Sequence, residues 1–562
     1  MKTATSDTCD YPHAPVKFLG VNPVNFTPQE SCSETSSRAG ARHLALIVTA
    51  AVIVTGLALR LIGLTYPPFD AHAYRQTETL STIDAFYRHG IDLFHPSTIY
   101  MGDPGTFVLE FPVFQALAAS LYDIFGPHLE IIRLLNILFG AGTVWLLYLI
   151  ARRLVNPMTA LLAFWIYWLA PLNILYQRSM LLDPMAVFCA MVSFYCLLWL
   201  VGTGNFVERR GAGWLEGLYF TCFAVATWLA VMTKALYLWP TVLLFGRAVI
   251  VRRFKPDSQI AGILAVFAIS GICFLFWNKY AGRVNDASPF VNAVEPVAGG
   301  VRPTSHLGFS ALLSREFYYV QLIHRPKLWL GVFGAILYPI GLLAAWKETR
   351  RGSPTSVLWL LIAAPPAYLL VFANINTPHE FYQLIITPFL AIISGYGLWW
   401  LGLRVVARLP KLGSAREAMV AGAGGLLIAA AVLTYCVWLR APSENAQLLR
   451  FQQLCAGKFE PWSPAMLFVS RDIYPNSSPI VPEFLYAAKL WGYARLVDNA
   501  GETRPEFETL APVFPQMEFV VFYGIGPPQW LPQSFHLDIQ DDRRCFYVFQ
   551  RVSAVHRIQG TR

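Results

Sequence analysis

The feature that most constrains this chain is a succession of long apolar runs, each near the length needed to cross a bilayer, about 20 residues. Of 562 residues, 55% are hydrophobic and 14% charged, which excludes an ordinary soluble protein. We therefore expect a polytopic α-helical membrane protein with about eleven spans. The runs are His43–Leu64, Ile131–Ile150, Met158–Tyr176, Met185–Val201, Trp214–Met232, Ala235–Ile250, Gln259–Asn278, Leu328–Trp346, Thr355–Ala373, Phe381–Leu403 and Ala418–Leu439.

Positive charges between these runs predict the orientation of the chain. The Lys and Arg clusters all fall on the side of Arg38 and Arg42 only if one shorter apolar segment, Phe111–Gly126, does not cross the membrane. Because cytoplasmic loops carry an excess of Lys and Arg, we expect this segment to be a juxtamembrane helix. The N-terminus is then cytoplasmic and the C-terminus outside. The positive residues behind the net charge of +9 lie in these clusters and orient the chain in the membrane, so no nucleic-acid partner is expected.

Composition divides the chain into three expected parts. Residues 1–41, rich in Ser, Thr, Pro and Asn, form a disordered cytoplasmic tail, and residues 42–439 form the transmembrane domain, with its first outer loop at 65–130. Residues 440–562 have short β-prone stretches between Pro and Gly turns, which predict a small extracytoplasmic α/β domain. Its role is interpreted as a lid, an acceptor platform or purely structural. Cys455 and Cys545 can pair if the compartment is oxidising.

The first outer loop holds most of the polar chemistry of the chain. Acidic and basic side chains near a membrane boundary are costly unless they are solvated, paired or used. Thr77–His89 reads as an amphipathic helix on the membrane surface, which would hold Asp70 at the rim of a cavity. We interpret Asp70 as the central catalytic residue. The alternative is that it caps a helix starting near Ala71, since Asp is a favoured N-cap.

Transfer of a group from a phosphate to a hydroxyl needs a base for the acceptor hydroxyl and groups that stabilise the departing phosphate. Asp70 is the candidate base or metal ligand. Asp183 and Glu110 are candidate partners, because paired carboxylates can share a proton or hold a divalent ion. His72 is a second candidate metal ligand, although a lone His is more often simply hydrogen-bonded.

Several cations are expected on the outer face, where the orientation rule does not explain them. Arg178 and Lys234 are the first candidates to bind the donor phosphate. Arg75, Arg302 and Arg325 follow them. The alternative for the first two is contact with lipid headgroups through snorkelling side chains.

The segment that opens a late span supplies candidates for orienting the donor. His379, Glu380 and Tyr382 stand near the start of a helix, where the positive end of the helix dipole suits a phosphate or a sugar hydroxyl. An aromatic belt explains Tyr382 but not His379 or Glu380. Gln76, in the first outer loop, is a further candidate of this kind.

These features together resemble a known family. FDAHAYRQTET after the first span, FVLEFPVFQALAASLYDIFG, RSMLLDP and HEFYQLIITPFLA look like the GT-C superfamily of polyprenyl-phosphate-dependent glycosyltransferases. Its relatives include bacterial family 39 enzymes, protein O-mannosyltransferases and the lipid A aminoarabinose transferase. The resemblance covers about Ala41 to Leu403. It implies that Asp70 is the catalytic Asp, Asp183 the second outer-loop acid and His379 the His heading the late span. Asp70 lacks the adjacent acid of the protein mannosyltransferases.

The resulting hypothesis is a glycosyltransferase of the bacterial cytoplasmic (inner) membrane whose active site faces the periplasm or exterior. The expected partners are a polyprenyl-phosphate sugar donor, membrane lipids and an acceptor lipid, glycan or protein. The one cofactor considered is a divalent metal ion at Asp70 and His72. A transporter or flippase of lipid-linked sugars is an alternative that predicts paired repeats and polar groups in mid-span. A polysaccharide polymerase or ligase is another, and it would yield a product ladder.

Overall fold

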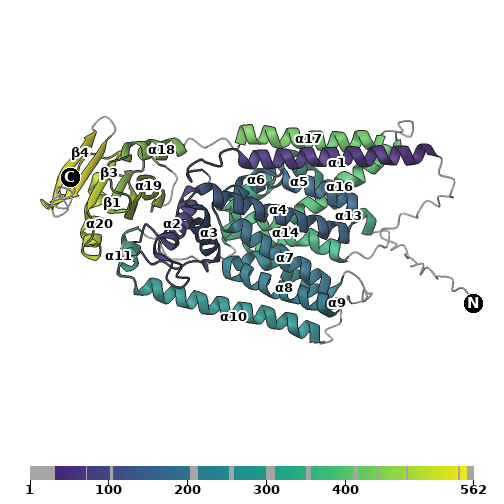
Figure 1. The fold of residues 1–562 in the computed structure, drawn as a ribbon, viewed down its shortest axis with the longest axis horizontal. Coiled ribbons are helices and arrows are strands. Elements are labelled where there is room, and N and C mark those ends of the chain that lie inside the picture. Colours follow the sequence, from purple (N-terminus) through teal and green to yellow (C-terminus); the bar gives the residue numbers. More distant parts are fainter. Residues whose placement is uncertain are drawn as a thin grey trace, which may run out of the picture.

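A computed structural model describes residues 32–70, 72–101, 105–202, 213–251, 258–298, 310–349, 356–408, 415–438, 444–475, 479–541 and 545–552. A long helical bundle makes up most of the molecule, and a small sheet domain stands at one end of it (Figure 1). The helices of the bundle are α1 (Cys32–Leu61), α4 (Leu129–Leu154), α5 (Pro157–Trp168), α6 (Pro171–Gln177), α7 (Asp183–Val201), α8 (Gly213–Lys234), α9 (Trp239–Val251), α10 (Ser258–Ala287), α13 (Arg325–Thr349), α14 (Ser356–Val371), α16 (Thr387–Arg408) and α17 (Ala415–Trp438).

Six helical segments among the described residues are long and apolar enough to cross a membrane, and up to eight if two bent pairs each form one span. Leu358–Val371 and Ala421–Cys436, at two further expected spans, are shorter apolar helices. Two other expected spans fall within one segment, Gly213–Val251, because only the short 3-10 turn η1 (Ala235–Leu238) separates α8 from α9. Helix α1 begins at Cys32, so the end of the tail expected to be disordered is helical.

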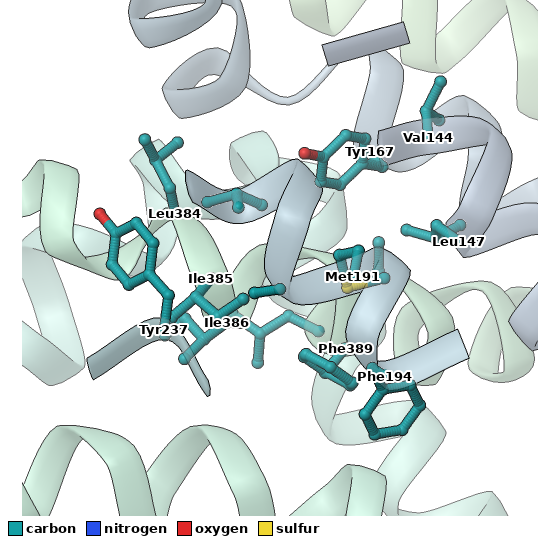
Figure 2. Packing of buried hydrophobic residues seen from close by; sticks show 14 of the residues in the cluster. Val144, Leu147, Tyr167, Met191, Phe194, Tyr237, Leu384, Ile385, Ile386 and Phe389 are labelled. Carbon is teal, nitrogen blue, oxygen red and sulfur yellow. The ribbon is translucent and has the colours of Figure 1, made fainter. Parts of the chain in front are cut away.

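The core of the bundle is apolar and closely packed. Figure 2 shows Phe194 of α7 against Phe389 of α16, with their rings edge to face and 5.3 Å between centroids. Helix α16 also approaches α13 through small residues, since a Cβ added to Gly341 would lie 2.0 Å from the carbonyl oxygen of Ile393. Because lipid supplies no hydrophobic drive between helices, such close approach is a main source of stability in a membrane.

Proline breaks position the outer end of the bundle. Helices α5 and α6 are bent by 58° at a break that ends at Pro171, the first residue of α6. Proline at the first helical position costs no hydrogen bond. The bend leads into the turn at Arg178, and α7 then begins at Asp183 with Pro184 in its first turn. The two polar residues that were predicted from this loop thus flank one short connection.

Helices of the first outer loop and of a later loop lie between the bundle and the sheet domain (Figure 1). They are α2 (Ala73–His89), α3 (Val113–Phe125) and α11 (Pro289–Ala298). Helix α2 begins before the expected Thr77, and it is enclosed rather than laid on a surface, with Leu80, Ile83 and Phe86 buried together with polar Ser81. The difference arises because α2 packs against both α3 and the sheet domain.

Residues 444–552, within the described ranges, form the small α/β domain. Its five-stranded sheet has the order β2-β1-β3-β5-β4, in which β1 pairs in parallel with β2 and β3, and β5 is antiparallel to β3 and β4. Cys455 is buried, Cys545 is exposed, and the two form no disulfide. The elements are α18 (Glu444–Cys455), β1 (Ser463–Ser470), α19 (Pro482–Ala488), β2 (Leu490–Val497), α20 (Thr503–Leu510), β3 (Phe519–Tyr523), β4 (Phe535–Asp541) and β5 (Phe546–Arg551).

Short elements complete the described chain. They are α12 (Arg315–Tyr319), α15 (Ala373–Asn376), the π-helical turn η3 (Val320–His324), and the 3-10 turns η2 (Ser310–Leu313), η4 (Glu380–Ile386), η5 (Ala500–Glu502) and η6 (Ala511–Val513). Among these, η4 carries the segment that was predicted to orient the donor.

Candidate active site

A buried arginine of α4 holds together the two outer loops that carry the candidate residues. Arg133 donates through Nε to the carbonyl of Arg178 (3.1 Å) and through Nη1 to the carbonyls of Leu64 (2.5 Å) and Tyr66 (2.6 Å). Asn136, one turn further along α4, donates to two more carbonyls of the loop at 2.8 and 2.7 Å. Backbone carbonyls that would otherwise lack partners are thereby satisfied, and the loop is fixed in place.

Asp70 lies against this fixed loop. Its Oδ2 is 3.7 Å from Nη2 of Arg178, and its Oδ1 accepts a hydrogen bond from Nε2 of Gln76. Gln76 in turn accepts from the backbone N–H of Met180 (3.0 Å). The residue that caps α2 is His72, in the left-handed conformation (φ 57°), and no side chain among the described residues caps this helix. The alternative of Asp70 as a helix cap is therefore not what the structure shows.

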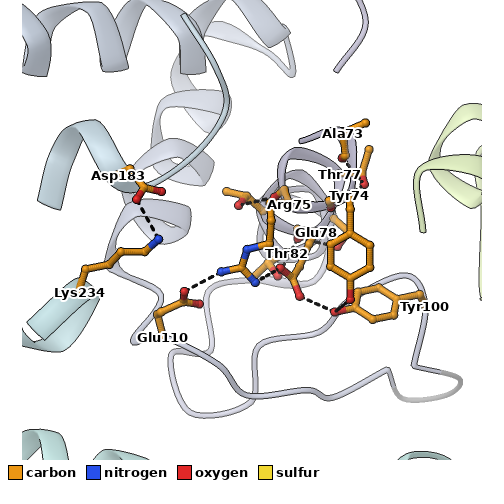
Figure 3. Close-up of polar contacts among 12 residues, drawn as sticks. Ala73, Tyr74, Arg75, Thr77, Glu78, Thr82, Tyr100, Glu110, Asp183 and Lys234 are labelled. Carbon is orange, nitrogen blue, oxygen red and sulfur yellow. Dashed lines mark hydrogen bonds and ion pairs between the residues drawn. The ribbon is translucent and has the colours of Figure 1, made fainter. Parts of the chain in front are cut away.

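Asp183 and Lys234 form a second pair, which is almost completely buried. Nζ of Lys234 lies 2.8 Å from Oδ1 of Asp183, and the side chains are 3% and 2% exposed (Figure 3). The hydroxyl of Tyr237 also contacts this oxygen. The ammonium group faces the rings of Phe381 and Tyr382, at 4.6 and 4.1 Å from their centroids. Aromatic faces stabilise a desolvated cation, so the charge of Lys234 is matched on two sides.

A third cluster is centred on Arg75. Its Nη2 donates to Oε1 of Glu110 (2.7 Å), its Nη1 to Glu78, and Tyr100 donates to the other oxygen of Glu78 (Figure 3). Burial alone would raise the pKa of Glu110, but Arg75 and then Lys234 hold this pKa below its ordinary value. Burial raises the pKa of Glu78 despite the same arginine.

Glu380 is held by groups from three other segments. Its Oε1 accepts from the hydroxyl of Tyr176 (2.9 Å) and lies 3.2 Å from Nε2 of His72. Its Oε2 accepts from Nη1 of Arg325 (2.6 Å). The glutamate thus ties the first outer loop, the end of α6 and the start of α13 to η4.

His379 stands beside this group in a poorly hydrated position. Its ring is stacked on Phe381 with centroids 5.2 Å apart, and its buried Nδ1 has no hydrogen-bond partner in the part of the chain that the structure describes. Burial, followed by repulsion from His72 and Arg75, lowers the pKa of His379 to about 4. The imidazole is therefore neutral at pH 7 and acts as a polar ring rather than a cation.

We expect this depressed pKa to make the protein less stable in acid. A histidine that is kept neutral on folding stabilises the fold above its unfolded pKa, about 6.5, and this stability is lost as the pH falls toward 4. In His379→Gln, the thermal unfolding temperature should fall less between pH 7 and pH 4.5 than in the wild type. Equal falls in the two proteins would contradict the prediction.

The structure brings the predicted carboxylates and cations to one end of the bundle, but in pairs of opposite charge. Asp70 contacts Arg178, Asp183 contacts Lys234, and Glu110 contacts Arg75. The expected sharing of a proton or ion between carboxylates is therefore not the observed arrangement. Arg325 pairs with Glu380. Arg302 lies outside the described residues.

Asp70 and His72, which the sequence suggested as ligands of a divalent metal ion, are not arranged to bind one. Asp70 is engaged by Arg178 and Gln76, whereas His72 is engaged by Glu380. Across the described part of the chain, no group of three or more His, Cys, Asp or Glu side chains is placed to hold an ion. A bound Mg²⁺ or Ca²⁺ needs several oxygen ligands around one point.

Sequence reasoning missed several residues that shape the site. Arg133 and Asn136 lie inside an apolar run, and Tyr176 and Tyr237 fall at the ends of others. The available signal was the presence of an arginine within a membrane span, which by itself marks a functional candidate. The tyrosines gave no such signal, because interfacial tyrosines are common.

Comparison with known proteins places this geometry in context. Residues 122–281 match the family model described as dolichyl-phosphate-mannose-protein mannosyltransferase. No sequence among curated proteins matches the chain. The fold resembles that of ArnT from Cupriavidus metallidurans bound to undecaprenyl phosphate, with a TM-score of 0.55, 13% identity, and coverage of 89% of this chain and 97% of ArnT.

An archaeal protein shows the same fold. The oligosaccharyltransferase AglB from Archaeoglobus fulgidus, in complex with an inhibitory peptide and a dolichol-phosphate, has a TM-score of 0.53 and 11% identity. The match covers 86% of this chain and 69% of AglB. The family model and the two folds confirm the resemblance that was inferred from the sequence motifs.

Proposed function

We propose that this chain, whose fold is that of the GT-C glycosyltransferases, transfers a sugar from a polyprenyl-phosphate donor to an extracytoplasmic acceptor. The family-model match and the fold support the reaction class. A bacterial inner membrane, with the site facing the periplasm, is the location we propose. It is supported by the Lys and Arg clusters of the sequence, which fall on the side of the membrane opposite to the outer loops that carry the candidate residues.

The observation that carries the assignment is the loose contact between Asp70 and Arg178. At 3.7 Å the pair is longer than a charge-assisted hydrogen bond, about 2.8 Å, so each group retains capacity for another partner. Among the described residues, Nε of Arg178 and Nη2 of the neighbouring Arg133 are buried and have no hydrogen-bond partner. Because Arg133 interacts with Glu130 as well as with Asp70, we assign the anionic lipid phosphate to the donor group of Arg178 that has no partner among these residues.

In this proposal Asp70 is the general base. It accepts the proton of the acceptor hydroxyl as that oxygen bonds to the anomeric carbon, while the bond between that carbon and the phosphate oxygen breaks. The lipid phosphate leaves with both bonding electrons, and Arg178 stabilises its charge. A single displacement of this kind inverts the anomeric centre.

The remaining candidates divide between orienting and supporting roles. The neutral ring of His379 and the ring of Tyr382 are proposed to orient the donor sugar. The charge of Lys234 is already matched by Asp183, so we assign the phosphate chiefly to Arg178. Gln76 fixes the orientation of the Asp70 carboxylate by donating to it. Arg75 and Glu110, which pair with one another, are proposed to support the part of the site next to Asp70 and Gln76.

The test is consumption of donor by the purified full-length protein in lipid nanodiscs. A panel of undecaprenyl-phosphate sugars is offered with membrane lipids and glycans as acceptors, and release of undecaprenyl phosphate is measured. We expect one donor to be consumed with a single sugar added to the acceptor. A ladder of products would indicate a polymerase instead, and movement of intact donor across the bilayer without release would indicate a flippase.

A further inference from the structure

The sheet domain and the first outer loop share one hydrophobic core. Phe69 and Ala73, which flank Asp70 and His72 in sequence, are buried in the same cluster as strands β1 and β3. Tyr100 and Phe107 of the loop belong to it as well. A loop that shares its core with a folded domain takes its position from that domain, because cores of native density do not deform freely.

Two polar connections run from the sheet domain to α2. In the first, the hydroxyl of Tyr486 on α19 donates to Oδ2 of Asp84 on α2 (3.3 Å). The ring of Tyr486 is partly buried against both the core of the bundle and that of the domain. Near it, the guanidinium of Arg88 lies 4.5 Å from the ring centroid of Trp462.

The second connection reaches the candidate site itself. The backbone N–H of Gly492 in β2 donates to the carbonyl of Ile99 (2.6 Å), so the first outer loop lines the edge of the sheet. The next residue, Tyr100, donates to Glu78, which also accepts from Arg75 (Figure 3). A continuous series of contacts therefore joins the sheet to the Arg75 cluster.

We infer that the C-terminal domain sets the position of α2, and that Tyr486 is a positioning residue for the transfer reaction. Helix α2 carries Arg75 and Gln76 toward the site at one end and Asp84 and Arg88 toward the domain at the other. The inference rests on the proposed function only for its catalytic consequence. The positioning itself is measurable without any donor.

The experiment compares variants of the full-length protein by hydrogen exchange of the amides of α2. Tyr486→Phe removes only the hydroxyl and should speed exchange about threefold, as expected for one lost hydrogen bond. Tyr486→Ala also removes the ring and should speed it about a hundredfold. Asp84→Ala should resemble Tyr486→Phe, whereas Asp84→Asn retains an acceptor for the tyrosine and should resemble the wild type.

Arg504→Ala is the matched control. Arg504 lies in the same domain on α20, its pair with Glu508 is exposed, and it takes no part in the two connections to α2, so exchange in α2 should not change. If Tyr486→Ala speeds exchange only within the sheet domain, the inference is overturned.

The catalytic consequence is read with whichever donor the panel identifies. A displaced α2 should lower kcat of Tyr486→Ala about tenfold and leave the donor KM unchanged, since poor orientation weakens the chemical step more than binding. An unchanged kcat, despite faster exchange, would overturn the role in the reaction. If the wild type consumes no donor, the proposed function fails, and the exchange data still decide whether the domain positions α2.

Discussion

Asp70→Asn is expected to lower the rate of sugar transfer about a thousandfold, within the range that a general base contributes. Asparagine has nearly the same shape and can still accept the hydrogen bond from Gln76, but it cannot take a proton from the acceptor hydroxyl. The measurement is release of undecaprenyl phosphate from the donor under saturating conditions. Binding of undecaprenyl phosphate alone should persist, because Arg178 and Arg133 remain in place.

Asp92→Asn supplies the matched control for this prediction. Asp92 is an acid of the same outer loop, and it is exposed and paired with His95 at 2.8 Å. The same chemical change there should leave transfer at the wild-type rate. An Asp70→Asn protein that keeps full activity and the wild-type unfolding temperature would remove Asp70 from the mechanism.

Local signals predicted much of the fold. The apolar runs marked the positions of the bundle helices, and prolines and polar residues marked their ends. The association of the first outer loop with the sheet domain was not predictable in this way, because it joins residues far apart in the chain. Asp84 and Tyr486, for example, are separated by 402 positions, and their direct hydrogen bond forms only when the loop and the domain fold together.

The candidate site, like the fold, was predicted from the sequence only in part. The sequence identified Asp70, Arg178, Asp183 and Lys234 from polar residues at the ends of apolar runs, and the structure gathers them at one end of the bundle. It did not predict their pairing. Which carboxylate meets which cation depends on helix rotation and on loop anchors such as Arg133, and neither is encoded in residue spacing.

The pairing gives Lys234 a role in the stability of the protein that the sequence did not predict. Lys234→Met should destabilise the protein by about 3–5 kcal/mol, because it removes the cation that pairs with the nearly buried Asp183 carboxylate. Asp183→Leu should destabilise the protein by a similar amount, because it removes the carboxylate that pairs with the buried lysine. The measurement is a large drop in the thermal unfolding temperature of the protein in lipid nanodiscs.

The double variant Lys234→Met/Asp183→Leu decides between a structural and a phosphate-binding lysine. Replacing both members of a buried pair by apolar groups removes two desolvated charges together, so the unfolding temperature should recover most of what either single change loses. If Lys234 instead served mainly to bind the donor phosphate, Lys234→Met would raise the donor KM and barely change the unfolding temperature. The near-complete burial of both side chains, the 2.8 Å contact and the aromatic faces around the ammonium group all favour the first result.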